Sequence, residues 1–394
     1  MKTARLDRWL PVGVVAFALF MDYLIYGLLI PLTPYSPARA TGEQELGLLY
    51  AAYSLGVLAA TPFFGFLGDR IGYRRPLIGG VALSAAALVL FWLAPHFHLL
   101  LLARLFQGAA SAASWTAGLA LIAEHYPNER VEMMGFALMG STAGSLLGPV
   151  IGGALYEVGG YGLPFLVTGG LMAIDAALVL LLPRRRVMAE PSPNIWPLLL
   201  DRSVLVTAAA VALAAIGWGI LEPLLPVQLA RSGVNPAIIG LIFTAGAIAY
   251  GSSAPLVAWV SKHVPVRRLI AGGTAAMAIA LPFLNVFSGA IGAGLAMCAV
   301  SICYAFMLNP TSAELGNAVD RRGMHCYAAV YAIYNIAYAL GQMEASGFAS
   351  AASGHLSFLQ TLLCVSAALV VFIPLLLLRE APLPQPAPQS SPQS

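Results

Sequence analysis

Long apolar runs broken by short polar stretches occupy most of this 394-residue chain. Each run approaches the roughly 20 residues that an α-helix needs to cross the hydrocarbon core of a bilayer. The pattern therefore predicts an all-α membrane protein with twelve spanning helices. We expect them near residues 9–34, 46–67, 76–94, 98–123, 132–155, 163–183, 203–229, 237–260, 268–287, 290–312, 325–350 and 357–378.

Composition supports this class of protein. Hydrophobic residues make up 59% of the chain and charged residues only 9%, which is more apolar side chain than a soluble protein of this length needs. The first run, from Trp9 to Pro34, is too long for the core of a signal peptide and lacks a small-residue cleavage site. We therefore expect it to be retained as a spanning helix. The four cysteines fall in or beside apolar runs, so we expect buried thiols and no disulfide.

The distribution of lysine and arginine predicts the orientation. If the N-terminus lies inside, seventeen of the twenty basic residues fall in cytoplasmic segments. Only Arg39 and Arg231 fall outside, and Arg104 falls within a helix. Because positive residues concentrate on the cytoplasmic side of membrane proteins, both termini are expected there, in a protein of the cell (inner) membrane.

The helices form two similar sets. The longest inner connection, 184–202, contains three consecutive arginines and several prolines and joins six helices to six more. Pro31-Leu-Thr-Pro34 ends the first helix, and Pro223-Leu-Leu-Pro226 ends the seventh, 192 residues later. Two parallel six-helix repeats are the architecture of one large class of transporters. The expected division is a bundle at 1–183, a linker at 184–202, a bundle at 203–380 and a disordered tail at 381–394.

A short segment rich in glycine and charged residues lies at the end of the second apolar run. The pattern G-x-L-x-D-R-x-G-x-R-R, from Gly65 to Arg75, resembles the signature of the loop between helices 2 and 3 in the major facilitator superfamily. A generic positive loop is the alternative, but the glycine and acid spacing argues against it. So does a degraded copy 192 residues later, in which Ser261 replaces Asp69. The resemblance implies a cytoplasmic latch between the halves, with Asp69 facing the start of the eleventh helix near Gly323–Cys326. The candidate latch residues here are Gly65, Asp69, Arg70 and Arg74.

The predicted fifth helix carries glycines four residues apart. Such a face lets helix backbones touch, and taken alone it indicates only packing. The fuller pattern G-x-x-x-G-P-x-x-G-G, which includes Gly144, Gly148 and Pro149, resembles the antiporter motif of drug/proton exchangers in the same superfamily. A proline inside a helix frees a carbonyl and bends the chain, which suits a hinge at a gate.

Two charged residues are expected at similar depth in the membrane. Arg104 and Gln107 share a face of the fourth helix, and R-x-x-Q-G resembles a superfamily motif whose arginine belongs to the proton-coupling machinery. The alternative is snorkelling to the outer surface, because Arg104 lies close to the start of its helix. A buried guanidinium costs at least ~2.5–3.5 kcal/mol, so it needs a partner or water. Asp22, midway along the first helix, is expected to pair with Arg104 or to take up a proton, since desolvation favours the neutral form.

Three segments resemble the vesicular amine transporters more closely. Asp22 to Pro34 resembles their first helix, whose acid is used for substrate and protons, and Leu221-Glu222-Pro223 resembles their seventh. Val330 to Asn335 resembles their eleventh, although an aspartate is expected where Asn335 stands. An amide cannot bind and release a proton, so Glu344, nine residues further on, is a candidate replacement.

Further polar and aromatic residues are candidates for structural or cavity-lining roles. Asp175 lies on the sixth helix, which belongs to the outer scaffold of this architecture, so we expect a hydrogen-bonded structural acid facing the bundle. Helices 1, 4, 7 and 10 are expected to line a central cavity open to Asp22, Arg104 and Glu222. Aromatic residues could line a site for a cation, although each could equally be ordinary packing. The candidates for the cavity wall are Tyr23, Tyr26, Gln107, Trp115, Trp218, Tyr331, Tyr334 and Tyr338.

The pattern favours transport over catalysis. We find no nucleotide loop, metal-ligand cluster or nucleophile–base spacing, and so expect no enzyme, cofactor, metal or nucleic-acid partner. Asp22, Glu222 and Glu344 against Arg104 make the expected cavity acidic, which favours cations. The prediction is a monomeric antiporter that exchanges organic cations, amines or multiple drugs for protons across the bilayer. The alternatives are uptake of a neutral or acidic solute and, with less support, a receptor that has lost transport.

Overall fold

A computed structural model describes residues 2–35, 43–126, 129–182, 201–286, 289–321 and 327–377. For 2–8, 69, 130–131, 313, 316–321 and 327–332 it describes the backbone only. Within these ranges the chain is helical apart from short turns and contains no strand. The expected all-α class is confirmed. The linker and the tail lie outside the described residues, so the proposed division into bundles stays a prediction.

The helices fall into two groups along the chain. The N-terminal half comprises α1 (Lys2–Leu32), the 3-10 turn η1 (Thr33–Tyr35), α2 (Glu43–Ile71), α3 (Arg74–Leu93), α4 (Phe97–His125), α5 (Arg130–Gly159) and α6 (Gly162–Leu180). The C-terminal half comprises α8 (Arg202–Gly219), α9 (Leu221–Arg231), α10 (Pro236–Val260), α11 (Val266–Val286), α12 (Ala290–Arg321), α13 (Tyr327–Ala352) and α14 (Phe358–Leu377). Eleven helical stretches of the described residues are long and apolar enough to cross a membrane, with α8 and α9 counted as one. With α13 they correspond to the twelve predicted spans.

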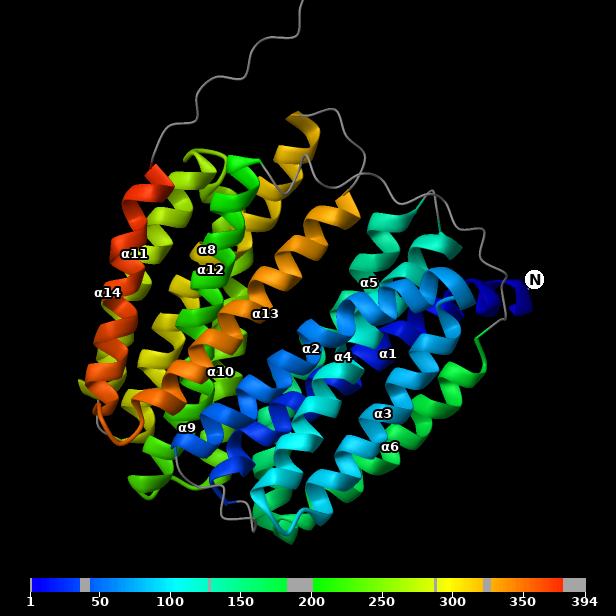
Figure 1. Ribbon diagram of the computed structural model, residues 1–394, viewed down its shortest axis with the longest axis horizontal. Coiled ribbons are helices and arrows are strands. Elements are labelled where there is room, and N and C mark those ends of the chain that lie inside the picture. Colours follow the sequence, from blue (N-terminus) through cyan, green and yellow to red (C-terminus); the bar gives the residue numbers. More distant parts are fainter. Residues whose placement is uncertain are drawn as a thin grey trace, which may run out of the picture.

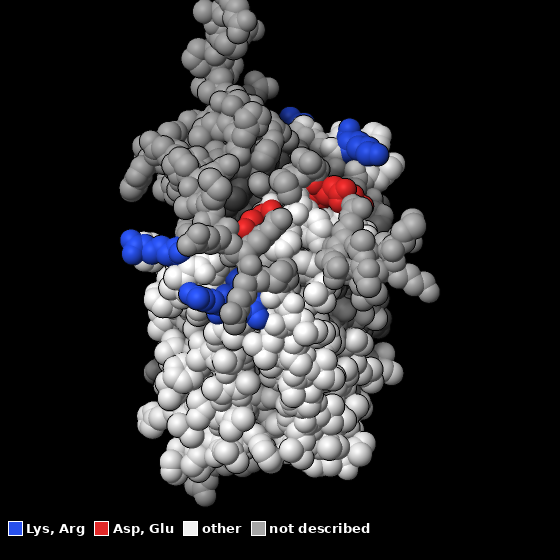
Figure 2. Space-filling view, turned by 90° about the vertical axis from the view of Figure 1, so that its right-hand side faces the viewer, with Lys and Arg blue, Asp and Glu red and all other residues white. Residues whose placement is uncertain are grey.

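The two ends of the bundle differ in charge. We call the end where α3, α8 and α11 begin the basic end, because Arg74, Arg202 and Arg267 lie there. The opposite end, where α9 ends and α10 begins, is called the far end. Figure 2 shows one face on which the coloured charged side chains gather toward the basic end, while the surface below them is white. An uncharged band of this kind is what the hydrocarbon core of a bilayer requires.

The glycine face of α5 packs on α1 within the N-terminal half. A Cβ on Gly140 would lie 1.9 Å from the carbonyl oxygen of Ala16, and one on Gly144 would lie 2.3 Å from that of Phe20. Backbones this close exclude any side chain larger than hydrogen. The motif also reaches the other half, because a Cβ on Gly240 of α10 would lie 2.1 Å from the carbonyl oxygen of Pro149. Pro149 therefore lies where the halves touch.

The halves are closed against each other at the far end. A Cβ on Gly47 of α2 would lie 2.6 Å from the Ser346 carbonyl oxygen of α13, and one on Gly153 of α5 would lie 2.4 Å from that of Pro236. Arg231 forms an ion pair with Glu43 at 2.6 Å. Figure 1 shows α2 and α13 converging at the far end, drawn at the bottom, and separating toward the basic end.

The turn between α2 and α3 is as tight as its sequence predicts. Gly72 adopts φ +85°, a left-handed conformation that favours glycine, and its N–H donates to the Gly68 carbonyl at 2.9 Å. Arg70 lies over the ring of Phe66 at 4.2 Å, and Arg74 donates to the carbonyl of Leu180. The side chain of Asp69 and residues 322–326 lie outside what the structure describes, so the latch stays a prediction.

We predict that Gly140→Ala destabilises the protein, because its methyl group would meet the Ala16 carbonyl and force α1 and α5 apart. Overpacking of this kind costs about 1–3 kcal/mol. Gly135→Ala on the same helix is the control, since a Cβ there has no neighbour within 4 Å. Thermal unfolding in detergent should show a lower midpoint for Gly140→Ala only. Equal midpoints for the two variants would contradict the close α1–α5 contact.

Candidate functional site

Asp22 lies at the centre of the N-terminal half, where three helices meet. Its side chain is 4% exposed, and Oδ2 accepts a hydrogen bond of 2.5 Å from the Ser111 hydroxyl of α4. Ser111 in turn accepts one of 3.0 Å from the Tyr53 hydroxyl of α2. Gly108 permits this arrangement, because any Cβ there would lie 2.0 Å from the Tyr53 carbonyl oxygen. The close packing of α2 on α4 thus positions Tyr53 to donate to Ser111 and Ser111 to donate to Asp22.

Arg104 is completely buried and is stabilised by aromatic rings. Its Nη1 donates to Gln107 Oε1 at 2.9 Å, whereas Nε and Nη2 have no hydrogen-bond partner among the described residues. The distances from its guanidinium carbon to four ring centroids are 4.5 Å (Tyr50), 5.3 Å (Tyr26), 5.6 Å (Phe91) and 5.9 Å (Tyr53). Cation–π attraction is strongest in such dry surroundings, about 2 kcal/mol or more. We call these four rings the arginine cage.

Two of the alternatives considered for Arg104 do not hold, and its role in proton coupling stays a prediction. Its zero exposure rules out snorkelling to the surface. No described carboxylate lies within ion-pair distance of it, so it does not pair with Asp22. The aromatic rings come from α1, α2 and α3, which a search for charge partners would not have found.

Glu222 lies beside a break in the predicted seventh helix. That helix is interrupted between α8 and α9, because Pro223 has no N–H to donate to the carbonyl of Gly219. Glu222 consequently sits in the first turn of α9, where the helix dipole favours a negative charge. The side chain is 3% exposed.

Three donors surround the Glu222 carboxylate. Trp218 Nε1 donates to Oε1 at 3.1 Å, and Gln342 Nε2 of α13 approaches Oε2 at 3.4 Å. The Tyr26 hydroxyl donates to Oε2 from the other half. Gly219 makes room for Gln342, because a Cβ there would lie 1.9 Å from Gln342 Oε1. Glu222 is thus held by both halves without a cation.

An aromatic wall extends from Glu222 through the C-terminal half. Trp218 stacks on Tyr304, with centroids 5.1 Å apart and planes at 20°. The Tyr304 hydroxyl donates to that of Tyr338, which stacks on Tyr334. Tyr250 lies 5.3 Å from Tyr304 and donates to Asn309. In the N-terminal half Tyr23 contacts Trp115 edge-on at 6.1 Å.

The remaining candidates lie elsewhere. Asn335 is exposed on α13, seven residues before Gln342 and therefore on the same helix face, toward the basic end. Glu344 is also exposed, but two residues beyond Gln342 it lies about 200° around the helix. The structure therefore does not bring Glu344 to Glu222, contrary to its predicted role as a replacement acid. The side chain of Tyr331 is outside the described residues.

Two further expectations need correction. Asp22, Arg104 and Glu222 are buried instead of opening to a cavity, because the closed far end and the tyrosines cover them. Asp175 does face the bundle, with 1% exposure, but its Oδ1 has no hydrogen-bond partner in the described part of the chain.

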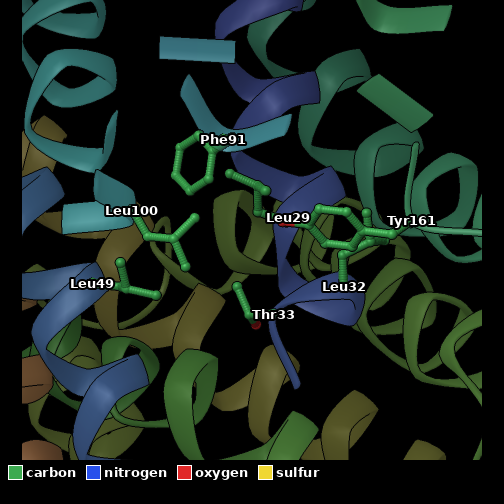
Figure 3. A pocket seen from close by; sticks show the side chains of 7 residues that line it. All are labelled: Leu29, Leu32, Thr33, Leu49, Phe91, Leu100 and Tyr161. Atoms are coloured by element: carbon green, nitrogen blue, oxygen red, sulfur yellow. The ribbon is translucent and has the colours of Figure 1, made fainter. Parts of the chain in front are cut away.

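A small cavity lies behind the arginine cage toward the far end. Figure 3 shows the ring of Phe91 on one side of it, with apolar side chains around. Its free volume of about 10 Å³ is that of a single water molecule, too little for an organic substrate. The lining residues are Leu29, Leu32, Thr33, Leu49, Phe91, Leu100 and Tyr161.

The arrangement can bind a cation or a proton. Two buried carboxylates, one from each half, lie among aromatic rings, and Arg104 adds a fixed positive charge that occupies neither of them. The sequence analysis did not predict Tyr50, Tyr53, Ser111 or Gln342 as site residues. Of these, only Tyr50 and Tyr53, which lie three residues apart in an apolar helix, could have been recognised from their spacing. Among the described residues no three His, Cys, Asp or Glu side chains are grouped to hold a metal.

We predict that Arg104→Lys destabilises the protein by about 2 kcal/mol, because an ammonium is more strongly hydrated than a guanidinium and stacks less well on rings. Arg70→Lys is the control, since Arg70 also lies over a ring but is exposed to solvent. Thermal unfolding in detergent should separate the two variants. An Arg104→Lys midpoint equal to wild type would mean that the cage does not stabilise the buried charge.

Comparison with known proteins gives relatives along most of the chain. The vesicular acetylcholine transporter of Drosophila melanogaster is 28% identical over 88% of this chain and 68% of its own length. The human chromaffin granule amine transporter is 32% identical over 76% of this chain and 59% of its own. The mouse synaptic vesicular amine transporter is 29% identical over 86% of this chain and 66% of its own length. The matched part is therefore between 59% and 68% of these relatives.

Solved structures and a family model agree on the fold. A bacterial homologue of the human lysosomal transporter Spinster superposes with a TM-score of 0.75 at 15% identity, covering 94% of this chain and 95% of that one. The nucleoside transporter NupG superposes with a TM-score of 0.73 at 12% identity, covering 93% and 98%. The model of the Major Facilitator Superfamily matches residues 15–206 and again residues 207–393. Because both halves match, the chain belongs to the Major Facilitator Superfamily.

Proposed function

We propose that this protein is a secondary active transporter that exchanges organic cations, amines foremost, for protons by alternating access. The observation that carries the proposal is the pair of buried carboxylates, Asp22 in one half and Glu222 in the other, among aromatic side chains. A carboxylate in a dry site is stable only when a proton, a cation or hydrogen-bond donors compensate its charge. That requirement makes proton and cation alternative occupants.

Asp22 is the better placed of the two to exchange its occupant. Among the described residues it accepts one hydrogen bond, from Ser111, whereas Glu222 accepts three. An ammonium that binds Asp22 displaces its proton, and protonation of Asp22 releases the ammonium. Asn335 cannot contribute a proton, and Glu344 faces away, so coupling rests on fewer acids than the vesicular resemblance implies.

The closed far end corresponds to an inward-facing state if the basic end is cytoplasmic, as the distribution of arginine indicates. Both termini would then be cytoplasmic, in a monomer of the cell membrane. The curated relatives are transporters of amines and of acetylcholine, which supports a small organic cation as the substrate here. Uptake of an acidic solute has less support, because Arg104 is enclosed by its cage and cannot reach an anion.

We predict that Asp22→Asn abolishes substrate-induced proton release, because an amide has no proton to exchange. The measurement is the pH change of purified protein in weakly buffered detergent when a saturating amine is added. Release should fall to less than about a tenth of wild type. Glu344→Gln, on the exposed opposite face of α13, is the control and should release protons normally.

Two outcomes would count against the proposal in different ways. Full proton release by Asp22→Asn would move coupling to another acid, with Glu222 the next candidate. A wild-type protein that released no protons with any cation, but was thermally stabilised by a neutral solute, would exclude antiport of cations.

A further inference from the structure

We propose that the Tyr26 hydroxyl links the occupancy of Glu222 to closure of the far end. In this inference, which rests on the proposed function, a proton or substrate cation arriving at Glu222 displaces Tyr26 and thereby loosens one half from the other. Tyr26 is then a positioning residue of the gate that separates the site from the far side.

The hydrogen bond from Tyr26 to Glu222 crosses between the halves. Tyr26 belongs to α1 and Glu222 to α9, 196 residues apart. The other two donors to this carboxylate, Trp218 and Gln342, belong to the same half as Glu222. Of the three, Tyr26 alone must separate from Glu222 when the halves part.

The same two chain segments are joined twice more toward the far end. The Tyr35 hydroxyl, at the end of η1, donates to the carbonyl of Val234 at 2.9 Å. Glu43, at the start of α2, pairs with Arg231 at the end of α9. α9 thus runs from Glu222 at the site to Arg231 at the closure. The Tyr26 bond is the innermost of three links between the segments 26–43 and 222–234.

Tyr26 is held from behind by its own half. Its ring lies 4.7 Å from that of Tyr53 and 5.9 Å from that of Tyr50, with the Arg104 guanidinium 5.3 Å away. A ring fixed in this way cannot follow Glu222 as the C-terminal half moves. Opening of the far end therefore breaks the bond instead of stretching it.

Competition for one oxygen supplies the coupling. Tyr26 donates to Glu222 Oε2, the atom that a proton or an ammonium N–H would also use. Besides Glu222 itself, the charged group beside this exchange is Arg104, whose guanidinium carbon lies 5.3 Å from the centroid of the Tyr26 ring. An occupant that removes the Tyr26 bond stabilises the opened state relative to the closed one, so its binding shifts the population toward opening.

The test measures, in the absence of substrate, the fraction of molecules in which the far end is open. Nitroxide labels on Glu157→Cys and Ser232→Cys, both exposed at the far end of opposite halves, report the separation by pulsed EPR in a background whose native cysteines are replaced. Tyr26→Phe keeps the ring and removes the hydroxyl. We expect the ratio of open to closed molecules to rise about tenfold, equivalent to about 1.4 kcal/mol.

Tyr50→Phe is the matched control. Tyr50 belongs to the same cage, but its hydroxyl makes no hydrogen bond to a described residue of the C-terminal half, so its removal should leave the far-end population unchanged. Glu222→Gln, whose amide is a weaker acceptor of similar shape, should also raise the ratio of open to closed molecules. It tests the same hydrogen bond if Tyr26→Phe folds poorly. In the Glu222→Gln background, Tyr26→Phe should add much less than tenfold, because the two changes remove the same interaction.

Three results would overturn the inference. The first is an unchanged population in both Tyr26→Phe and Glu222→Gln. The second is a Tyr50→Phe effect as large as that of Tyr26→Phe, and the third is a full tenfold effect of Tyr26→Phe in Glu222→Gln. None of these depends on transport: amine-driven proton release with an unchanged population would reject the gate and keep the proposed function. A shifted population without proton release would support the gate and reject the antiport.

Discussion

Three ionisable side chains have to be stabilised without bulk water: Asp22 and Arg104 within the N-terminal half, and Glu222 where the two halves meet. The surrounding structure meets that constraint in three ways. Asp22 accepts a serine hydroxyl, Arg104 lies among four rings, and Glu222 accepts three donors. A buried charge without compensation would cost several kcal/mol. The helices around the site are therefore held as closely as glycine allows.

Glycine determines which helices can approach closely enough to supply these partners. Gly108 lets α4 pack closely on α2, so that Ser111 lies within hydrogen-bond distance of Tyr53. Gly219 leaves room for the Gln342 side chain beside Glu222. The stripe from Gly140 to Gly152 holds α5 on α1, the helix that carries both Asp22 and Tyr26. Packing inside each half is thus rigid where it supports the site. The interface between the halves is where movement has to occur.

The two acids differ in what holds them. Asp22 is held within one half, so exchange of its occupant requires no separation of the halves. Glu222 is held by both halves, so a change in its occupancy alters the interface itself. In the proposed mechanism, proton and cation therefore exchange at Asp22, and the gate responds to Glu222 through Tyr26. Because Asn335 is an amide and Glu344 faces away, the proposed mechanism depends on these two buried carboxylates and not on Glu344.

The sequence by itself determined the membrane class, the number of spans, the repeat and the tight turn at Gly72, and it identified Asp22, Arg104 and Glu222 as candidates. Those features depend on local composition and spacing, which can be read within sequence stretches of about 20 residues, the length of one spanning helix. Only the tertiary structure decided that Arg104 is caged by rings, that Glu344 faces away and that Tyr26 bonds Glu222. Helices that are apolar on every side do not encode their rotation about their axes. Their partners, up to 199 residues distant, are chosen by how closely neighbouring backbones can pack.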